Sequence, residues 1–163
     1  MTDQRKNSIP QKIGWLCSYV PEELILAVGM VPVRITGEAE RIEEAEAYLT
    51  PNFCPYLKNV LESGLKSRFV SLGAIIFTSS CDGMRRLFDI WANYIEKPPP
   101  YLLEVPKRRD DPAIDYFSEQ HGRLKTWLEE TFDITISHEM LAKTISQMNS
   151  QRDAVLNLFE KQK

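Results

Sequence analysis

Short apolar runs alternate with amphipathic segments along this chain. Four runs have the length and apolar content of strands: residues 12–17, 31–35, 72–77 and 101–105. Five segments have the apolar spacing or the terminal residues of helices: 21–28, 55–66, 84–95, 113–132 and 137 to the last lysine. Residues 37–48 are acidic and rich in alanine, and they predict either a solvated helix or a mobile loop with a helical part.

The order of these segments predicts the fold class. Strands that alternate with helices indicate an α/β protein with a mostly parallel sheet, here a three-layer sandwich of about four strands with additional C-terminal helices. The 72–77 run is continuously apolar, as in a strand that is covered on both faces. A chain of 163 residues suits one domain, which we assign to residues 12–163, after a flexible N-terminus at 1–11.

The helix periodicity also predicts which side chains face the core. In the 84–95 segment these are Leu87, Phe88, Trp91 and Tyr94. In the 113–132 segment they are Tyr116, Phe117, Leu124, Trp127 and Leu128.

Composition and charge narrow the function classes. The chain is 43% hydrophobic and 26% charged, which excludes wholesale disorder, and its net charge of −3 argues against a nucleic-acid partner. The apolar run Leu24–Val33 falls short of the roughly 20 residues of a membrane span, so no membrane partner is expected. Without an apolar signal core in its first residues, the chain is expected to be cytoplasmic. It has no phosphate-cradling glycine loop, so it is not expected to hydrolyse ATP itself.

Three cysteines carry the candidate chemistry. By count alone, Cys17, Cys54 and Cys81 are either unrelated buried thiols or a shared site. Cys17 ends the first predicted strand, and Cys81 follows the third predicted strand. Cys54 begins the helix that leads into that third strand. All three are therefore expected at the carboxyl edge of the sheet, each near a helix start. Soft thiolates without histidine partners favour iron–sulfur or zinc, and the paired spacing typical of zinc is missing.

Four segments of the chain carry a family resemblance, and their order along the chain agrees with that family. Three contain a cysteine: residues 14–25 with Cys17 and the Val20-Pro21-Glu22-Glu23 stretch, Phe53-Cys54-Pro55-Tyr56, and residues 77–86 with Ser80-Cys81-Asp82-Gly83. The fourth is residues 27–34. From about residue 12 to the C-terminus, the chain resembles the first domain of the 2-hydroxyacyl-CoA dehydratase component D and benzoyl-CoA reductase family.

The resemblance implies a flavodoxin-like or Rossmann-like domain and an oxygen-sensitive iron–sulfur cluster held between two such domains. Cys54 and Cys81 match its cluster ligands. Cys17 matches a position that is cysteine mainly in the double-cubane branch, so the implied cofactor is a [4Fe–4S] or a double-cubane [8Fe–9S] cluster. The resemblance also implies an ATP-hydrolysing iron–sulfur activator as a partner, which would pass a low-potential electron to this component for a reduction or a radical dehydration of an acyl-CoA.

The chain is about half as long as members of the resembled family, in which a second domain supplies further cysteine ligands. We therefore expect a cluster-binding subunit or fragment that is incomplete as an enzyme alone. Its partner is expected to be a second domain or a homologous subunit. Without that partner, the cluster site can be unoccupied. The alternative is a cluster-free truncated homologue that acts as an interaction or dimerisation module.

Several polar residues near the predicted edge have two interpretations each. Ser80, with Ser79, either hydrogen-bonds cluster sulfur or caps the next helix. Glu22, Arg85 and Arg86 either contact a substrate or partner or lie on solvated helix starts. The run Lys107-Arg108-Arg109 either meets a CoA phosphate or is neutralised by the adjacent Asp110-Asp111.

Overall fold

The computed structural model describes residues 11–161, so residues 1–10 of the expected flexible N-terminus lie outside the described part. The strands are β1 (Lys12–Trp15), β2 (Val31–Arg34), β3 (Leu72–Thr78) and β4 (Pro100–Leu103). The helices are α1 (Glu22–Ala27), η2 (Ala45–Ala47, a single 3₁₀ turn), α2 (Pro55–Leu65), α3 (Asp82–Tyr94), α4 (Asp111–Phe132) and α5 (His138–Glu160).

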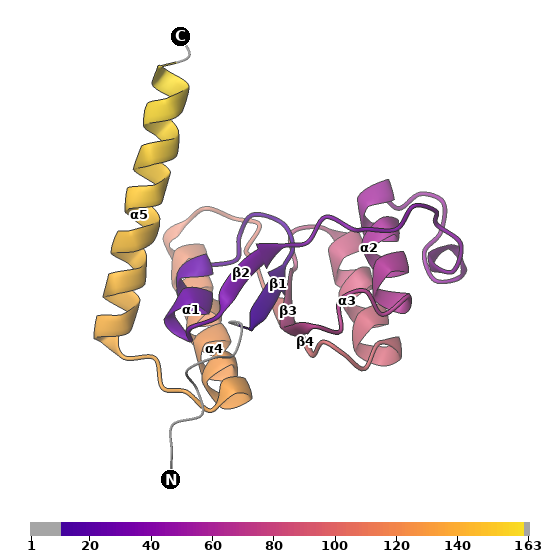
Figure 1. Cartoon of the computed structure of the whole chain (residues 1–163), viewed down its shortest axis with the longest axis horizontal. Helices are drawn as coiled ribbons and strands as arrows, with labels where there is room; N and C mark the ends of the chain where they lie inside the picture. The colour runs from indigo at the N-terminus through magenta and orange to yellow at the C-terminus, as the bar shows by residue number, and fades with distance from the viewer. Residues whose placement is uncertain (1–10, 162–163) are drawn as a thin grey trace.

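The four strands form one sheet in the order β2-β1-β3-β4, and every neighbouring pair is parallel. Helices α2 and α3 cover one face of the sheet, and α1 and α4 cover the other, with α5 packed outside α1 (Figure 1). The predicted three-layer α/β sandwich with a parallel sheet of four strands is therefore confirmed. All four strands end at the same edge, which makes the carboxyl edge the natural place for a site.

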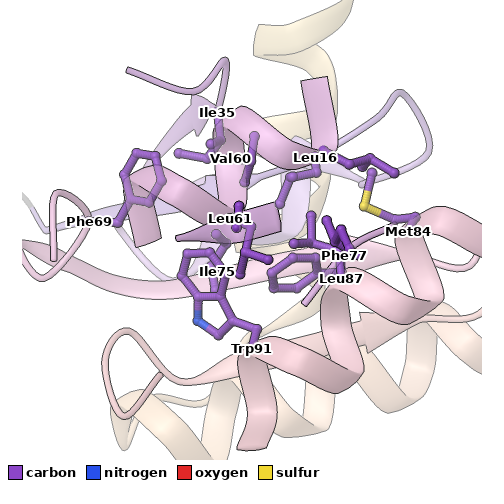
Figure 2. Packing of buried hydrophobic residues seen from close by; sticks show 13 residues of the cluster. Leu16, Ile35, Val60, Leu61, Phe69, Ile75, Phe77, Met84, Leu87 and Trp91 are labelled. Carbon is purple, nitrogen blue, oxygen red and sulfur yellow. The ribbon is translucent and has the colours of Figure 1, made fainter. Parts of the chain in front are cut away.

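The core on the α2–α3 face is built around Trp91 (Figure 2). Its side chain is fully buried, and its ring centroid lies 5.4 Å from that of Phe77 and 6.1 Å from that of Phe69. The indole nitrogen donates a hydrogen bond to the Pro98 carbonyl at 3.2 Å. Gly64 of α2 is needed at the contact, because a Cβ there would lie 2.5 Å from the indole ring.

A second core fills the opposite face of the sheet. It joins Ile13 and Ile76 of the sheet to Ile25 of α1 and Leu124 and Leu128 of α4. Burial on both faces explains why the sequence of β3 is a continuous apolar run rather than an alternating one.

Local signals place the helix ends. Pro55 occupies the first turn of α2, where its missing N–H is not required. The side chains of Asp110 and Ser137 cap α4 and α5 by accepting from the Ala113 and Met140 amides. Gly29, at φ 78°, follows α1 in the left-handed conformation that glycine adopts without strain.

Residues 37–48 differ from expectation. They form an irregular loop with one 3₁₀ turn, and Ala45 is buried. The Glu62 carboxylate holds the loop by accepting from the amides of Glu43 (3.0 Å) and Ala45 (2.8 Å), while Lys66 Nζ lies 2.8 Å from its other oxygen. The segment is therefore neither a solvated helix nor a mobile loop. It is a loop that the buried carboxylate of Glu62 holds in place.

Two tyrosines predicted to face the core are exposed instead. Tyr94, the last residue of α3, is 63% exposed and its ring packs on Tyr48 at 5.0 Å. Tyr116 is exposed as well, with its hydroxyl bonded to Glu104. Among the described residues, none of the helices combines the length and the apolar character needed to cross a membrane.

Candidate functional site

All three cysteines lie at the carboxyl edge of the sheet or at a helix start beside it. Cys17 follows the end of β1 by two residues, and its φ of 65° places it in the left-handed region. Cys54 and Cys81 are the N-cap residues of α2 and α3, with extended backbones. The thiols of Cys54 and Cys81 are exposed and that of Cys17 is half-buried. The structure thus places each cysteine after a strand end or at a helix start, and a shared role of the three thiols as ligands stays a prediction.

A chain of hydroxyl hydrogen bonds reaches the Cys17 sulfur. Ser80 Oγ donates to Cys17 Sγ at 3.2 Å, and the buried Thr78 Oγ1 donates to Ser80 Oγ at 3.1 Å. Ser80 precedes Cys81, so one turn ties the end of β1 to the start of α3. A hydrogen bond to sulfur stabilises negative charge on it, which is the charge state in which cysteine ligates metal.

The Cys81 sulfur has a donor of its own. The Met84 amide lies 3.4 Å from Cys81 Sγ, as in a helix cap in which sulfur replaces the usual oxygen. The first-turn amides of α3 and the helix dipole both favour an anion at this position.

A glycine lets the starts of α2 and α3 approach each other. A Cβ at Gly83 would lie 2.5 Å from Leu57 Cδ1 and 3.2 Å from Phe53 Cδ1. Phe53 and Leu57 flank Cys54, and Gly83 follows Cys81 by two residues. This close packing therefore sets the placement of the Cys54 and Cys81 backbones relative to each other.

Tyr56 lies near Cys17 and Cys54. The sequence placed it in the Phe53-Cys54-Pro55-Tyr56 segment of the resemblance, without a role of its own. Its hydroxyl donates to the Ile35 carbonyl at 2.8 Å. Burial, and then the negative charges of Cys17 and Cys54, outweigh the opposing effect of Arg34 and raise the pKa of Tyr56 to about 12. The tyrosine therefore stays a neutral hydrogen-bond donor, half-buried near two candidate ligands.

The three thiols do not form a ready-made site for a single ion. Within residues 11–161, no group of three or more His, Cys, Asp or Glu side chains is placed to hold a metal ion. The donors fit an iron–sulfur cluster in chemical type, because they are thiols with N–H and O–H donors to sulfur. Three thiols are too few to complete the coordination of such a cluster, so its remaining ligands would come from outside residues 11–161.

The other predicted site residues are spread around this edge. Glu22 opens α1, and burial, then the charge of Glu23, raises its pKa. Arg86 is exposed and pairs with Asp89 at 3.6 Å on the same helix. Arg85 is exposed and has no ion-pair partner among the described residues. No contact joins Glu22 to Arg85 or Arg86 in this part of the chain.

Glu23 has a structural role. Its carboxylate pairs with Arg152 at 2.6 Å, and its carbonyl accepts from Thr144 Oγ1 at 3.1 Å. Both partners are on α5. The second glutamate of the Val20-Pro21-Glu22-Glu23 stretch thus fastens α5 to the body of the domain rather than serving the cysteine edge.

Comparison with known proteins gives a consistent result. The chain is 27% identical to a benzoyl-CoA reductase subunit of Thauera aromatica over 96% of this chain and 42% of that protein. It is 27% identical to lactoyl-CoA dehydratase subunit beta of Anaerotignum propionicum, over 99% of this chain and 42% of the relative. It is 29% identical to the (R)-2-hydroxyglutaryl-CoA dehydratase subunit beta of Acidaminococcus fermentans, over 87% of this chain and 38% of the relative.

The chain thus spans about two fifths of the length of these curated relatives. The sequence model of the family described as 2-hydroxyglutaryl-CoA dehydratase, D-component, matches residues 17–163. This match includes all three cysteines and every helix of the described structure. The resemblance inferred from the three cysteine-bearing segments is confirmed, and the chain belongs to the 2-hydroxyglutaryl-CoA dehydratase D-component family.

Proposed function

We propose that this chain is the cluster-binding part of a system related to the 2-hydroxyacyl-CoA dehydratases and benzoyl-CoA reductases. Cys17, Cys54 and Cys81 are its proposed ligands to a [4Fe–4S] or double-cubane [8Fe–9S] cluster. The observation that carries the proposal is the placement of the three thiols at one edge of the sheet, two of them as helix caps. When bound, an iron–sulfur cluster supplies a one-electron carrier.

The chain's own residues hold and orient the ligands in this proposal. Ser80 donates to Cys17 Sγ, and the Met84 amide donates to Cys81 Sγ. Such donors orient ligating sulfur atoms and tune the potential of a bound cluster. The Thr78 hydroxyl fixes Ser80 in the donating orientation by occupying its acceptor lone pair.

The proposal includes partners. A second domain or a homologous subunit supplies the remaining cluster ligands, and an ATP-dependent iron–sulfur activator supplies electrons. Arg85 and Arg86, exposed on the first turn of α3, and Glu22 are the residues we propose for contact with that activator or with an acyl-CoA substrate. The names of the relatives support acyl-CoA chemistry for the whole system.

The test is anaerobic reconstitution with iron and sulfide, followed by iron analysis and a visible spectrum. Wild-type protein is expected to turn brown with stoichiometric iron, and Cys81→Ala is expected to lose that iron and the absorption. Ser150→Ala, which removes an exposed hydroxyl on α5, is the matched control and should retain both. Iron in the wild type no higher than in Cys81→Ala would contradict cluster binding by this domain.

One observation favours the second candidate function, a cluster-free module that pairs with a second copy of the chain. The final turns of α5 project beyond the body of the domain (Figure 1). Four apolar side chains there are 50–63% exposed: Val155, Leu156, Leu158 and Phe159. Val155 and Phe159 continue the helix stripe of Leu141 and Ile145 past Arg152, which pairs with Glu23 of α1.

Sedimentation analysis of the chain tests this second candidate. Self-association through α5 predicts a dimer whose dissociation constant rises at least about tenfold in Phe159→Glu, because the variant places a charge on the apolar stripe. Glu139→Gln, on the first turn of the same helix, is the control and should leave the dimer unchanged. A wild-type chain that stays monomeric at millimolar concentration would exclude the dimer.

A further inference from the structure

A pocket of about 530 Å³ lies beside the cysteine edge and is not used by the proposed ligands. It is formed where the loops after β1, β3 and β4 meet the first turns of α4. Tyr19 comes from the first loop, Ser79 and Ser80 from the second, and the segment 105–109 from the third. Ala113, Ile114 and Phe117 of α4 complete the wall.

One part of the pocket lining consists of three consecutive cations, Lys107, Arg108 and Arg109. Arg108 is paired with Asp110, whereas Lys107 and Arg109 have no ion-pair partner within residues 11–161. The sequence left open whether Asp110 and Asp111 neutralise this run, and the structure shows that the pairing reaches only one of the three cations.

The nearby acids are already engaged. Asp110 also accepts from the Ala113 amide as the cap of α4, and Glu104 is bonded to Tyr116. These carboxylates and the adjacent Asp111 keep their negative charge, and this part of the lining is distinguished by Lys107 and Arg109, which form no ion pair with them.

The pocket also offers a hydroxyl and an apolar wall. Ser79 is 2% exposed, and its oxygen accepts from the Val105 amide at 2.8 Å, which leaves the hydroxyl hydrogen free to point toward an acceptor. Ile114, 62% exposed, and Phe117 add carbon to the lining of the same pocket. A lining that combines cations, a hydroxyl and carbon suits a ligand that is anionic at one end and apolar at the other.

We propose that this pocket binds an organic oxyanion, a phosphate or carboxylate carried on an apolar body. Lys107 and Arg109 hold the oxygens, Ser79 donates to one of them, and Ile114 and Phe117 cover the apolar part. Ser80 lines the pocket and donates to Cys17 Sγ, so the ligand is placed against the candidate cluster edge. The inference depends on the proposed function only for that neighbour, since binding requires no iron.

The test uses phenyl phosphate and phenylacetate as probes, with inorganic phosphate as the ligand without an apolar body. Titration of the iron-free chain is followed by backbone amide shifts at Ser79 and in segment 105–109. Whichever of the two phenyl probes carries the anionic group that the pocket prefers is expected to bind at least about threefold more tightly than inorganic phosphate, because Ile114 and Phe117 add apolar contact. Tighter binding of phenyl phosphate identifies a phosphate ligand, and tighter binding of phenylacetate a carboxylate.

Two variants separate the charged and apolar parts of the pocket. Lys107→Ala combined with Arg109→Ala is expected to weaken the tighter probe at least about tenfold, because two charge-assisted hydrogen bonds are lost. Ile114→Ala should weaken that probe about threefold while leaving inorganic phosphate unchanged. All three side chains are exposed, so the fold should persist.

Lys143→Ala on α5 is the matched control and should bind like the wild type. The proposal fails if neither probe shifts the pocket amides at 10 mM, if the double variant binds as the wild type does, or if Lys143→Ala weakens binding equally. Iron content is measured separately. A chain that binds iron but neither probe would overturn this inference alone, and one that binds a probe but no iron would overturn only the cluster proposal.

Discussion

Replacing Trp91 with alanine is expected to lower the free energy of unfolding by about 3–5 kcal/mol, the largest effect expected of any single substitution named for this chain. Trp91 is fully buried, and its ring fills the space between the aromatic rings of Phe69 and Phe77. It also packs edge-on against Gly64, where even a methyl group would not fit. Because α2 and α3 are both locked by this ring, they cannot collapse into the cavity without losing their packing on β3.

Urea unfolding followed by far-UV circular dichroism measures this effect. Tyr94→Ala, one turn further along α3, is the control. It should lower the free energy of unfolding by less than about 1 kcal/mol, because Tyr94 is exposed. Equal losses in the two variants would show that α3 does not pack as described.

Glu62→Gln is expected to destabilise the protein by about 1.5–3 kcal/mol at pH 7, the range for hydrogen bonds to a charged group. Burial alone would raise the pKa of Glu62, but the Lys66 ammonium and the amides of Ala45 and Glu43 outweigh it and lower the pKa to about 2. Glutamine keeps an acceptor for the amides, yet it faces Lys66 with a second donor.

The pH dependence of this effect has a definite sign. A carboxylate whose pKa falls on folding stabilises the native state above its ordinary pKa of about 4.5, and it loses that contribution as the pH falls toward about 2. The difference in stability between wild type and Glu62→Gln should therefore be full at pH 7 and shrink steadily below pH 4.5. Glu46→Gln removes an exposed carboxylate 3.9 Å from Lys58 and should show no such difference. A pH-independent difference for Glu62→Gln would contradict the described loop anchor.

Most of the fold could be predicted because its signals are local. Apolar runs mark the buried strands, and Pro55, Asp110 and Ser137 mark helix starts through geometry that needs only a few neighbouring residues. Residues 37–48 could not be predicted in this way. Their anchor, Glu62, is 17 residues from Ala45, and a carboxylate in a helical segment normally faces water.

Tyr94 shows the limit of periodicity. It follows Trp91 by three residues and so shares its helix stripe, but it is the last residue of α3 and its ring meets Tyr48 instead of the core. The period of a helix predicts the side of the helix on which a residue lies. The residue is buried only if another element of the fold extends far enough to cover that side.

The candidate site was predictable in outline and not in detail. Placing Cys17, Cys54 and Cys81 at one edge needed only the strand order along the chain and the rule that parallel strands share a carboxyl edge. The hydrogen bond from Ser80 to Cys17, by contrast, joins residues 63 positions apart and depends on the left-handed backbone at Cys17. Tyr56 was named in the Phe53-Cys54-Pro55-Tyr56 segment, but its contact with the site was not predicted, because an aromatic residue in an apolar helical segment indicates a core position first.

The two outer strands of the sheet affect how copies of this chain can meet. An exposed strand edge invites pairing with another chain, and proteins limit this with short edge strands and with proline, which has no N–H to donate. Strands β2 and β4 are each four residues long, and they carry Pro32 and Pro100. Sheet-to-sheet aggregation is thus disfavoured at both sides of the molecule, and association between copies is left to helical surfaces such as the end of α5.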